Sequence, residues 1–458
     1  MAAQTIVILG AGFGGIEAAR HLSALLPESE TCDIVLVDRH NYSLFTPMLT
    51  EVASGQVDAD EIVVAVRSLG PRVRFEQGDV TSIDPKARTV TITIGDPAQD
   101  IPQTRRTIRA DHLVIALGSV NNFHHIPGLQ EHSIGIKSVD DAAAIRSRAV
   151  ALLERADEEP DAAERRALLT FVVGGGGFSG VETMAAVNDM VRDLAEKFPR
   201  VQPHDIRTVI AHPADRLLPE LDAGLAAYAQ KELQRRGVEV RLQTEVSGAG
   251  ADYVEVKDSK NGKGERIYTH TIIWTGGVKP NPVIDSAGVK LGKHHGIVVD
   301  GCCRVQGHPH VWALGDCAEV PKPGGKGTYA PTAQNATREG AQVARNIAAV
   351  MRGGDPQPFD YHPIGELAVV GKRAGVASLY GVHISGIAAW AMWRMVYLAK
   401  LPSLPKRLRV GFDWVMDLAT GRDVVDTHTA VRDGPPHSGQ AQSAQQPEKE
   451  KEAATASR

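Results

Sequence analysis

Short apolar runs alternating with glycine-rich turns open the chain. Residues 5–9 form an apolar run rich in β-branched residues, which predicts a strand buried on both faces. A glycine-rich turn follows at 10–15, and apolar positions at helical spacing predict a helix over 16–26. After a loop at 27–31, a second apolar run at 33–38 ends in an acid. This order of elements predicts a dinucleotide-binding βαβ unit.

The same pattern returns in the middle of the chain. Residues 168–173 predict a strand, 174–180 a glycine turn, 181–195 a helix and 206–211 the next strand. A motif that occurs twice at this separation indicates two dinucleotide-binding units rather than an array of short repeats.

The segments around the second unit have other characters. The highly charged stretch 154–166 contains a proline and predicts an exposed connection. Residues 252–269 alternate polar and apolar positions around a polar turn and predict a hairpin. Residues 384–399 and 406–419 predict two helices with apolar faces. Residues 431–458 hold almost no large apolar side chain and predict a disordered tail.

Composition then narrows the class of protein. The 458 residues are 43% hydrophobic and 23% charged, which is typical of a folded chain of about three domains. A net charge of −5 argues against a nucleic-acid partner. The four cysteines form no C-x-x-C pair, which excludes a disulfide scaffold and favours a reducing, cytoplasmic setting. We expect neither a signal peptide nor a transmembrane helix.

The first glycine turn has residues suited to a dinucleotide. Gly10 permits the tight turn, Gly12 lets the backbone approach a pyrophosphate, and Gly15 lets the helix pack close to the strand. The helix N-terminus offers free amides to the phosphates. Asp38, at the end of the second strand, is placed to accept hydrogen bonds from a ribose diol.

The second turn carries Gly175, Gly177 and Gly180, but His212 stands where the ribose-binding acid is expected. A histidine is not an anionic acceptor. Either His212 donates to a 2′-phosphate together with Arg216, or another group binds the ribose. Two units in one chain indicate a flavoprotein in which hydride passes from NAD(P)H to FAD.

Six stretches resemble one known family. They are Asn41–Gly55, Leu113–Gly118, Phe171–Glu182, Trp274–Asn281, Ala313–Ala318 and Ala330–Gln334. With these motifs, residues 4–430 resemble a type II NADH dehydrogenase, a single-chain NADH:quinone oxidoreductase that pumps no protons. The absence of a redox cysteine pair in the first unit argues against a disulfide reductase.

The resemblance implies an α/β fold with two Rossmann-like domains. The FAD-binding domain comprises 1–120 and 290–365, interrupted by an NAD(P)H-binding domain at 121–289, and 366–430 form a region for membrane association and dimerisation. FAD is bound non-covalently, NADH is the donor with NADPH left open, and no metal is expected. The implied cofactor-binding residues are Gly10, Gly12, Phe13, Gly14, Gly15, Asp38, Arg39, Pro47, Val80, Ala116, Gly118, Gly175, Gly177, Gly180, His212, Gly276, Gly277, Gly315, Asp316, Ala333 and Gln334.

Three residues are catalytic candidates. Glu182 lies one turn into the second helix, where it can hydrogen-bond nicotinamide or relay a proton to quinone; the alternative is a charge favoured by the helix dipole. Gln334 belongs to the Ala-Gln motif that the family places at the junction of flavin and quinone. Arg338 stands on the same helix face, where the family often has a second Gln, and leaves the identity of the acceptor open.

The C-terminal helices carry apolar faces, three tryptophans and basic residues. The residues concerned are Trp390, Trp393, Trp414, Lys400, Lys406, Arg407 and Arg409. This pattern predicts a helix pair that lies on an anionic membrane; the alternative is a dimer interface or a core helix pair. We expect a peripheral homodimer on the cytoplasmic face of the cell membrane, with a quinone as its partner.

Two other functions stay open. A soluble flavin reductase for a protein acceptor, such as a ferredoxin or rubredoxin, would have no use for the tryptophan-rich C-terminus. A redox-responsive binding protein would turn over slowly with every acceptor. The sequence does not distinguish menaquinone from ubiquinone.

Overall fold

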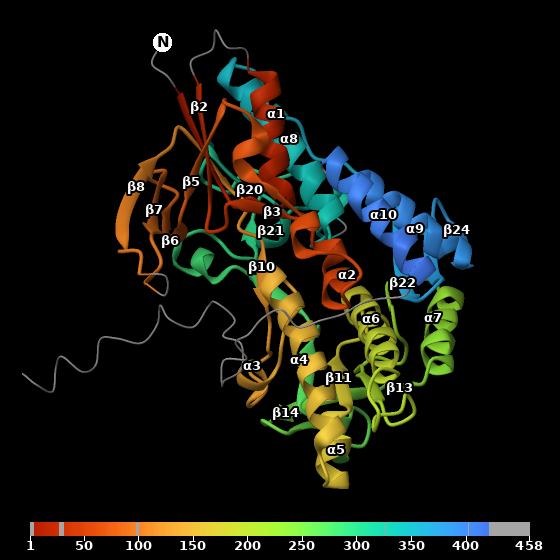
Figure 1. Cartoon of the computed structure of the whole chain (residues 1–458). Coiled ribbons are helices and arrows are strands. Elements are labelled where there is room, and N and C mark those ends of the chain that lie inside the picture. The colour runs from red at the N-terminus through yellow and green to blue at the C-terminus, as the bar shows by residue number, and fades with distance from the viewer. Residues whose placement is uncertain (1–3, 27–31, 98–99, 326, 402, 421–458) are drawn as a thin grey trace, which may run out of the picture.

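The chain forms two α/β units and a C-terminal extension that lies beside both (Figure 1). The computed structural model describes residues 4–26, 32–97, 100–325, 327–401 and 403–420. The loop predicted at 27–31 and the tail predicted at 431–458 lie outside these residues.

A sheet of five parallel strands, in the order β20-β9-β1-β2-β5, forms the centre of the first unit. Its strands are β1 (Gln4–Leu9), β2 (Cys32–Asp38), β5 (Val73–Gln77), β9 (His112–Ile115) and β20 (Val311–Ala313). Helices α1 (Phe13–Leu25) and α8 (Ala333–Met351) lie side by side against one face (Figure 1). Because β20 and α8 follow the second unit in sequence, this unit is built from two separated parts of the chain.

Smaller elements surround this sheet. A two-stranded antiparallel pair, three short 3-10 segments and α2 precede an antiparallel sheet of three strands, and further short elements follow the second unit in sequence. They are β3 (Tyr42–Leu44), η1 (Thr46–Met48), α2 (Leu49–Ala53), η2 (Ala59–Ile62), β4 (Val63–Ala65), η3 (Val66–Leu69), β6 (Asp79–Asp84), β7 (Thr89–Ile94), β8 (Thr104–Arg109), β19 (Ile297–Val298), η6 (Gly315–Cys317), β21 (Ala318–Glu319) and η7 (Pro323–Gly325).

The second unit holds a four-stranded parallel sheet in the order β13-β12-β11-β17, with an antiparallel sheet β14-β15-β16 beside it. Its elements are α3 (Leu129–His132), α4 (Val139–Glu158), α5 (Ala162–Leu168), β11 (Thr170–Gly174), α6 (Phe178–Ala195), β12 (Arg207–Ala211), α7 (Ala223–Arg235), β13 (Val238–Arg241), β14 (Thr244–Ala249), β15 (Tyr253–Asp258), β16 (Gly264–Tyr268) and β17 (Thr271–Trp274). The short segment η5 (Pro282–Ser286) packs against β6 in the core of the first unit. The predicted hairpin at 252–269 is β15 and β16. The two connections between the units pair as β10 (Ser119–Asn121) and β18 (Val278–Pro280).

The stretch 154–166 is mostly exposed, as predicted, but most of it is helical rather than an irregular connection. Ser138 and Asp141 form a capping box that starts α4, and the Asp161 side chain caps α5. Alanine, glutamate and arginine favour helix wherever a cap allows it to begin, and charge indicates exposure rather than irregular structure.

The C-terminal extension is a three-stranded antiparallel sheet followed by two helices. Its elements are β22 (Gly365–Gly371), β23 (Ala374–Leu379), β24 (Val382–Gly386), α9 (Ile387–Lys400) and α10 (Leu404–Thr420). The first helix was predicted from residue 384, but Gly386 has a φ of +76°, so the strand ends there before the helix begins. Among the described residues, no helix combines the length and apolar character needed to cross a bilayer.

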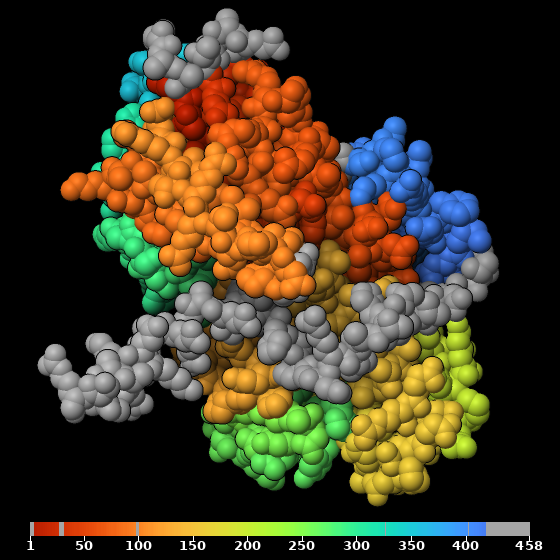
Figure 2. Space-filling model, turned by 60° about the vertical axis from the view of Figure 1, so that its left-hand side comes forward, coloured from red at the N-terminus to blue at the C-terminus, as the bar shows by residue number. Residues whose placement is uncertain are grey.

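The core of the second unit also includes side chains from the rest of the molecule. Met48 and Val52 from the segment around α2, and Trp393 and Trp414 from α9 and α10, belong to the same buried cluster as Met184 of α6. Each fully buried large apolar side chain contributes about 1.5–3 kcal/mol. The C-terminal helices are therefore packed where the two units meet, and Figure 2 shows them (blue) beside the junction of the upper and lower parts.

Candidate active site

The first glycine turn leaves room for a phosphate. A Cβ on Gly15 would lie 1.8 Å from the carbonyl oxygen of Gly10, so the helix approaches the strand as closely as glycine allows. At Gly12, the N-cap of α1, no atom lies within 4 Å of where a Cβ would sit, and no side chain caps the helix. Uncapped amides facing open space fit the pyrophosphate of FAD.

Asp38 ends β2 and closes the turn. Its carboxylate accepts hydrogen bonds from the amides of Ala11 (2.6 Å) and His40 (2.8 Å). The neighbouring Arg39 forms an ion pair with Asp79 (3.2 Å) at the start of β6, and Val80 is buried beside it. These residues stand together at the carboxyl ends of the strands, where open α/β sheets bind their ligands.

The second turn repeats this geometry with a different acceptor. A Cβ on Gly180 would lie 1.9 Å from the Gly175 carbonyl oxygen, as in the first turn. The amide of Gly176 donates to Nδ1 of His212 (3.1 Å). Burial lowers the pKa of His212, which favours the neutral ring that this bond requires, with the proton on Nε2. Arg216 donates to the carbonyl of Pro219 (2.9 Å).

Asp316 lies in a polar chain that crosses between the units. Its carboxylate accepts from the hydroxyl of Ser119 (2.6 Å), which in turn accepts from the Lys137 ammonium (2.6 Å). Glu339 of α8 accepts from the amide of Gly315 (2.7 Å), and burial raises the pKa of Glu339 to about 7. Burial also lowers the pKa of Lys137, whose charge Asp316 helps to retain. Residues from both units thus hold the Gly-Asp turn in place.

Gly276 and Gly277 lie between β17 and β18, where the chain returns from the second unit to the first. The Trp274 indole donates to the carbonyl of Asn122 (2.8 Å), and the His124 ring bonds the carbonyl of Gly276 (3.1 Å). The remaining predicted cofactor residues stand at the edge of the first sheet or in its adjoining segments. Phe13 and Gly14 begin α1, Pro47 lies in η1, Ala116 and Gly118 follow β9, and Ala333 begins α8.

Glu182 is the half-buried acid of the site. Its Oε1 accepts from the amide of Val369 (3.1 Å) and from the indole Nε1 of Trp393 (3.2 Å), both of the C-terminal extension. Burial raises the pKa of Glu182 to about 8, and the negative charge of Glu51 adds to the rise. The carboxyl is therefore largely protonated at neutral pH. A solvent-exposed carboxylate at a helix terminus would be ionised at that pH.

An aromatic wall encloses this acid. Trp393 packs against Tyr397 (ring centroids 4.4 Å apart) and Trp414 (6.3 Å). The Trp414 indole donates to Glu51 (3.3 Å), and Tyr397 reaches Phe45 (6.0 Å) beside α2. Trp393 and Trp414 are only 1% and 4% exposed, so their prediction as interfacial tryptophans is wrong. Their indole N–H groups find partners in buried carboxylates rather than in lipid headgroups.

Two residues of the basic cluster predicted to face a membrane, Lys406 and Arg409, bond α10 to the first unit, and Arg409 remains 67% exposed. Lys406 donates to two backbone carbonyls of η2 and β4, and Arg409 forms an ion pair with Glu61 (3.2 Å). Arg407 donates to the carbonyl of Leu401 (2.6 Å). These cations lie next to acceptors that spacing along the chain does not reveal.

Gln334 and Arg338 meet at Tyr361. The oxygen of the Gln334 side chain accepts from the Tyr361 hydroxyl (2.7 Å) and the Ile364 amide (3.2 Å), which directs its amide nitrogen away from them. The Arg338 guanidinium lies 5.5 Å from the centre of the Tyr361 ring. Burial and the nearby charge of Arg338 lower the pKa of Lys400 at the end of α9. The α9 helix therefore borders both this cluster and Glu182.

Sequence reasoning missed the partners of the predicted residues. Ser119, Lys137 and Glu339 around Asp316 gave no periodic or spacing signal. An acid at position 51 within the apolar turn 49–53 was a usable signal, because an isolated buried carboxyl requires a partner.

Two family models match the chain. Residues 4–340 match the pyridine nucleotide-disulphide oxidoreductase model, and 364–423 match the NDH2 C-terminal domain. A probable NADH dehydrogenase of Dictyostelium discoideum is 30% identical over 92% of this chain and 91% of that protein. The type II NADH:quinone oxidoreductase NdhA of Mycobacterium tuberculosis is 30% identical over 89% and 86%.

The fold also has a solved counterpart. NDH2 from Plasmodium falciparum, determined in complex with NADH, superposes with a TM-score of 0.84 at 20% identity, over 92% of this chain and 99% of that one. This likeness concerns the fold alone. Together with the family models and the two relatives, the motifs are those of one group: the chain belongs to the type II NADH dehydrogenases of the pyridine nucleotide-disulphide oxidoreductase family.

Proposed function

We propose that this chain oxidises NADH and passes the electrons through FAD to a quinone without pumping protons. The observation that carries the proposal is the half-buried Glu182, whose carboxyl accepts hydrogen bonds from Val369 and Trp393 of the C-terminal extension. FAD, when bound, accepts hydride from NADH and delivers two electrons to the quinone. The chain's own residues bind the cofactors and supply the proton.

Glu182 is the proposed proton donor. A quinol takes up two electrons and two protons; the hydride of NADH supplies both electrons and one proton, so the site needs a group that holds the second proton at neutral pH. A carboxyl whose pKa burial raises to about 8 does so and can release the proton to a developing quinol oxygen. The aromatic wall around it limits the entry of water.

Gln334 and Arg338 are the proposed quinone-binding residues. Because Tyr361 and Ile364 engage the oxygen of the Gln334 amide, its nitrogen is the atom that donates to a quinone carbonyl. Arg338 offers a second, charged donor from the next turn of α8. We assign FAD to the turn around Gly12 and nicotinamide to the segment around Gly276, as the family pattern implies.

We further propose peripheral attachment to the cytoplasmic face of the membrane, in a homodimer. An exposed apolar row on α10 supports the attachment: Leu404, Leu408, Phe412 and Val415 are all more than 60% exposed. Lys406 and Arg409 of the same helix are bonded to the first unit.

The test of the reaction is steady-state oxidation of NADH by the FAD-loaded chain with a soluble short-chain quinone, repeated with NADPH. We expect quinone-dependent turnover that Glu182→Gln slows far more than it slows flavin reduction by NADH, most strongly below about pH 8, where the wild-type carboxyl holds its proton. Flavin reduction without quinone turnover would remove the assignment of the acceptor.

The test of attachment is cosedimentation with vesicles that contain anionic lipid. We expect the double variant Leu408→Gln, Phe412→Gln to remain in the supernatant, while Tyr380→Gln, an equally exposed change on the hairpin after β23, still sediments. Sedimentation of the double variant would show that another surface binds the membrane. The molar mass in solution tests the homodimer.

A further inference from the structure

Glu182 and Asp189 lie on one face of α6. Each accepts a hydrogen bond from a backbone amide of the hairpin formed by β22 and β23. The amide of Val369 donates to Glu182 (3.1 Å), and the amide of Lys372 donates to Asp189 (2.7 Å). Seven helical residues and three strand residues both span about 10 Å, so helix and strand can run in register between the two contacts.

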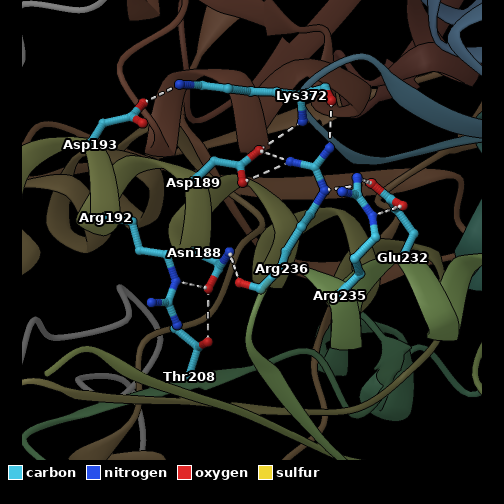
Figure 3. Close-up of polar contacts among 9 residues, drawn as sticks. All are labelled: Asn188, Asp189, Arg192, Asp193, Thr208, Glu232, Arg235, Arg236 and Lys372. Atoms are coloured by element: carbon cyan, nitrogen blue, oxygen red, sulfur yellow. Dashed lines mark hydrogen bonds and ion pairs between the residues drawn. The ribbon is translucent and has the colours of Figure 1, made fainter. Parts of the chain in front are cut away.

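Asp189 belongs to a buried ion pair with Arg236, at the end of α7 (Figure 3). The two oxygens of Asp189 lie 3.1 and 3.3 Å from Nη1 of Arg236, and the two side chains are only 10% and 16% exposed. The Nε of the same Arg236 guanidinium forms an ion pair with Glu232 (2.8 Å). Replacing Asp189 with a neutral residue therefore removes one of two acids paired with Arg236 and leaves Glu232 as the other.

This pair grips the backbone of Lys372 from two sides. Asp189 accepts its amide, and Arg236 donates to its carbonyl (2.5 Å), as Figure 3 shows. A Cβ on Gly371 would lie 2.7 Å from the guanidinium carbon, so the hairpin passes as close to Arg236 as glycine permits. The Lys372 ammonium makes a separate, exposed ion pair with Asp193 (2.5 Å).

We infer that the Asp189–Arg236 pair is a positioning device for the proposed proton donor: by gripping Lys372, it holds β22 and α9 over Glu182. This inference rests on the proposed function. Without the pair, the hairpin moves away from α6, and more water reaches the Glu182 carboxyl. In the described part of the chain, the titratable groups that interact electrostatically with Glu182 are Glu51 of α2 and Tyr397 of α9, while β22 contributes only its backbone.

The test follows protonation of Glu182 without turnover. Infrared difference spectra between each FAD-loaded full-length protein and its Glu182→Gln counterpart, titrated with pH, report the carboxyl itself. Because loss of burial outweighs loss of one amide bond, we expect the Glu182 midpoint to fall by about one pH unit in Asp189→Asn. Amide exchange at Val369 and Lys372 should accelerate about tenfold in the same variant.

Asp193→Asn is the matched control, since it removes a carboxylate from the same helix that meets the same lysine only through the exposed ammonium. It should leave the midpoint and the exchange unchanged. Where Asp189→Asn fails to fold, Arg236→Lys keeps the charge but not the reach to both Asp189 and the Lys372 carbonyl, and it should show the same fall. An unchanged Glu182 midpoint in both Asp189→Asn and Arg236→Lys, or an equal fall in Asp193→Asn, overturns the inference. Lack of quinone turnover by the wild type would overturn the proposed function instead, leaving this readout intact.

Discussion

The two glycine turns of this chain share a backbone arrangement and differ in one charge. In the first turn the amide of Ala11 donates to the Asp38 carboxylate; in the second the amide of Gly176, at the equivalent place, donates to the neutral His212 ring. Both acceptors follow the second strand of their unit. The bond between turn and strand is kept although the acid is replaced.

The comparison separates two tasks of this position. Closing the turn requires a lone pair, which a neutral imidazole nitrogen supplies as a carboxylate does. Binding a ribose diol and repelling a 2′-phosphate require negative charge, which only Asp38 has. At this position, the second unit therefore keeps the hydrogen bond that closes the turn but has no negative charge.

Replacing the middle glycine of either turn with alanine should have the largest effect on cofactor binding. The space beside Gly12 is open, and beside Gly177 only the Glu220 carboxylate lies at 4.0 Å, so alanine fits the protein and intrudes only on a bound pyrophosphate. We expect Gly12→Ala to lose FAD, and Gly177→Ala to keep FAD with a KM for NADH raised about 100-fold, or ~2.8 kcal/mol. Flavin absorbance per chain and NADH oxidation measure the two effects. An unchanged KM would mean that the nucleotide phosphates bind elsewhere.

Removing the acid of the first turn should have the next largest effect. Asp38→Ala deprives two amides of their acceptor, and each unsatisfied group costs about 1–3 kcal/mol where water cannot replace it. We expect FAD to bind at least about tenfold more weakly. Dissociation of FAD, followed by flavin fluorescence, measures this. In the second unit His212→Ala removes only one such bond, so an effect on FAD as large as that of Asp38→Ala would contradict the comparison.

Restoring the acid in the second turn should change nucleotide preference. In His212→Asp the carboxylate keeps the bond to Gly176 and adds a negative charge near the ribose. We expect kcat/KM for NADPH to fall about tenfold relative to that for NADH. His212→Asn is the control, since it offers an acceptor without charge. Equal losses for both nucleotides would show that His212 does not face the 2′ position.

The smallest expected effect is on acid stability. Burial lowers the pKa of His212 below its ordinary 6.5, so the unfolded chain binds the proton more readily than the folded one. Stability from this group is therefore complete above pH 6.5 and is lost as pH falls through the folded pKa. Thermal unfolding midpoints should fall less on acidification in His212→Asn than in the wild type. Parallel curves would exclude a contribution from His212.

Local motifs carried most of the correct predictions. Both glycine turns, their flanking strands and helices, and the positions of Asp38, Glu182 and Asp316 follow from residues close together in the chain, because a tight turn and a helix start are local events. At 154–166 the exposure was predicted but the helix was not, because charges indicate exposure, whereas capping by Ser138 and Asp161 decides whether helix forms.

The sequence by itself determined the two βαβ units, the class of cofactor and the family. Only the tertiary structure decided what surrounds the reactive groups: it placed Trp393 and Val369 on Glu182, and Lys137 and Ser119 beside Asp316. It also placed Trp393 and Trp414 in the interior rather than at a surface. The physical reason is that a turn depends on neighbouring residues, while burial, and with it the proton affinity of a carboxyl, depends on segments brought together from distant parts of the chain.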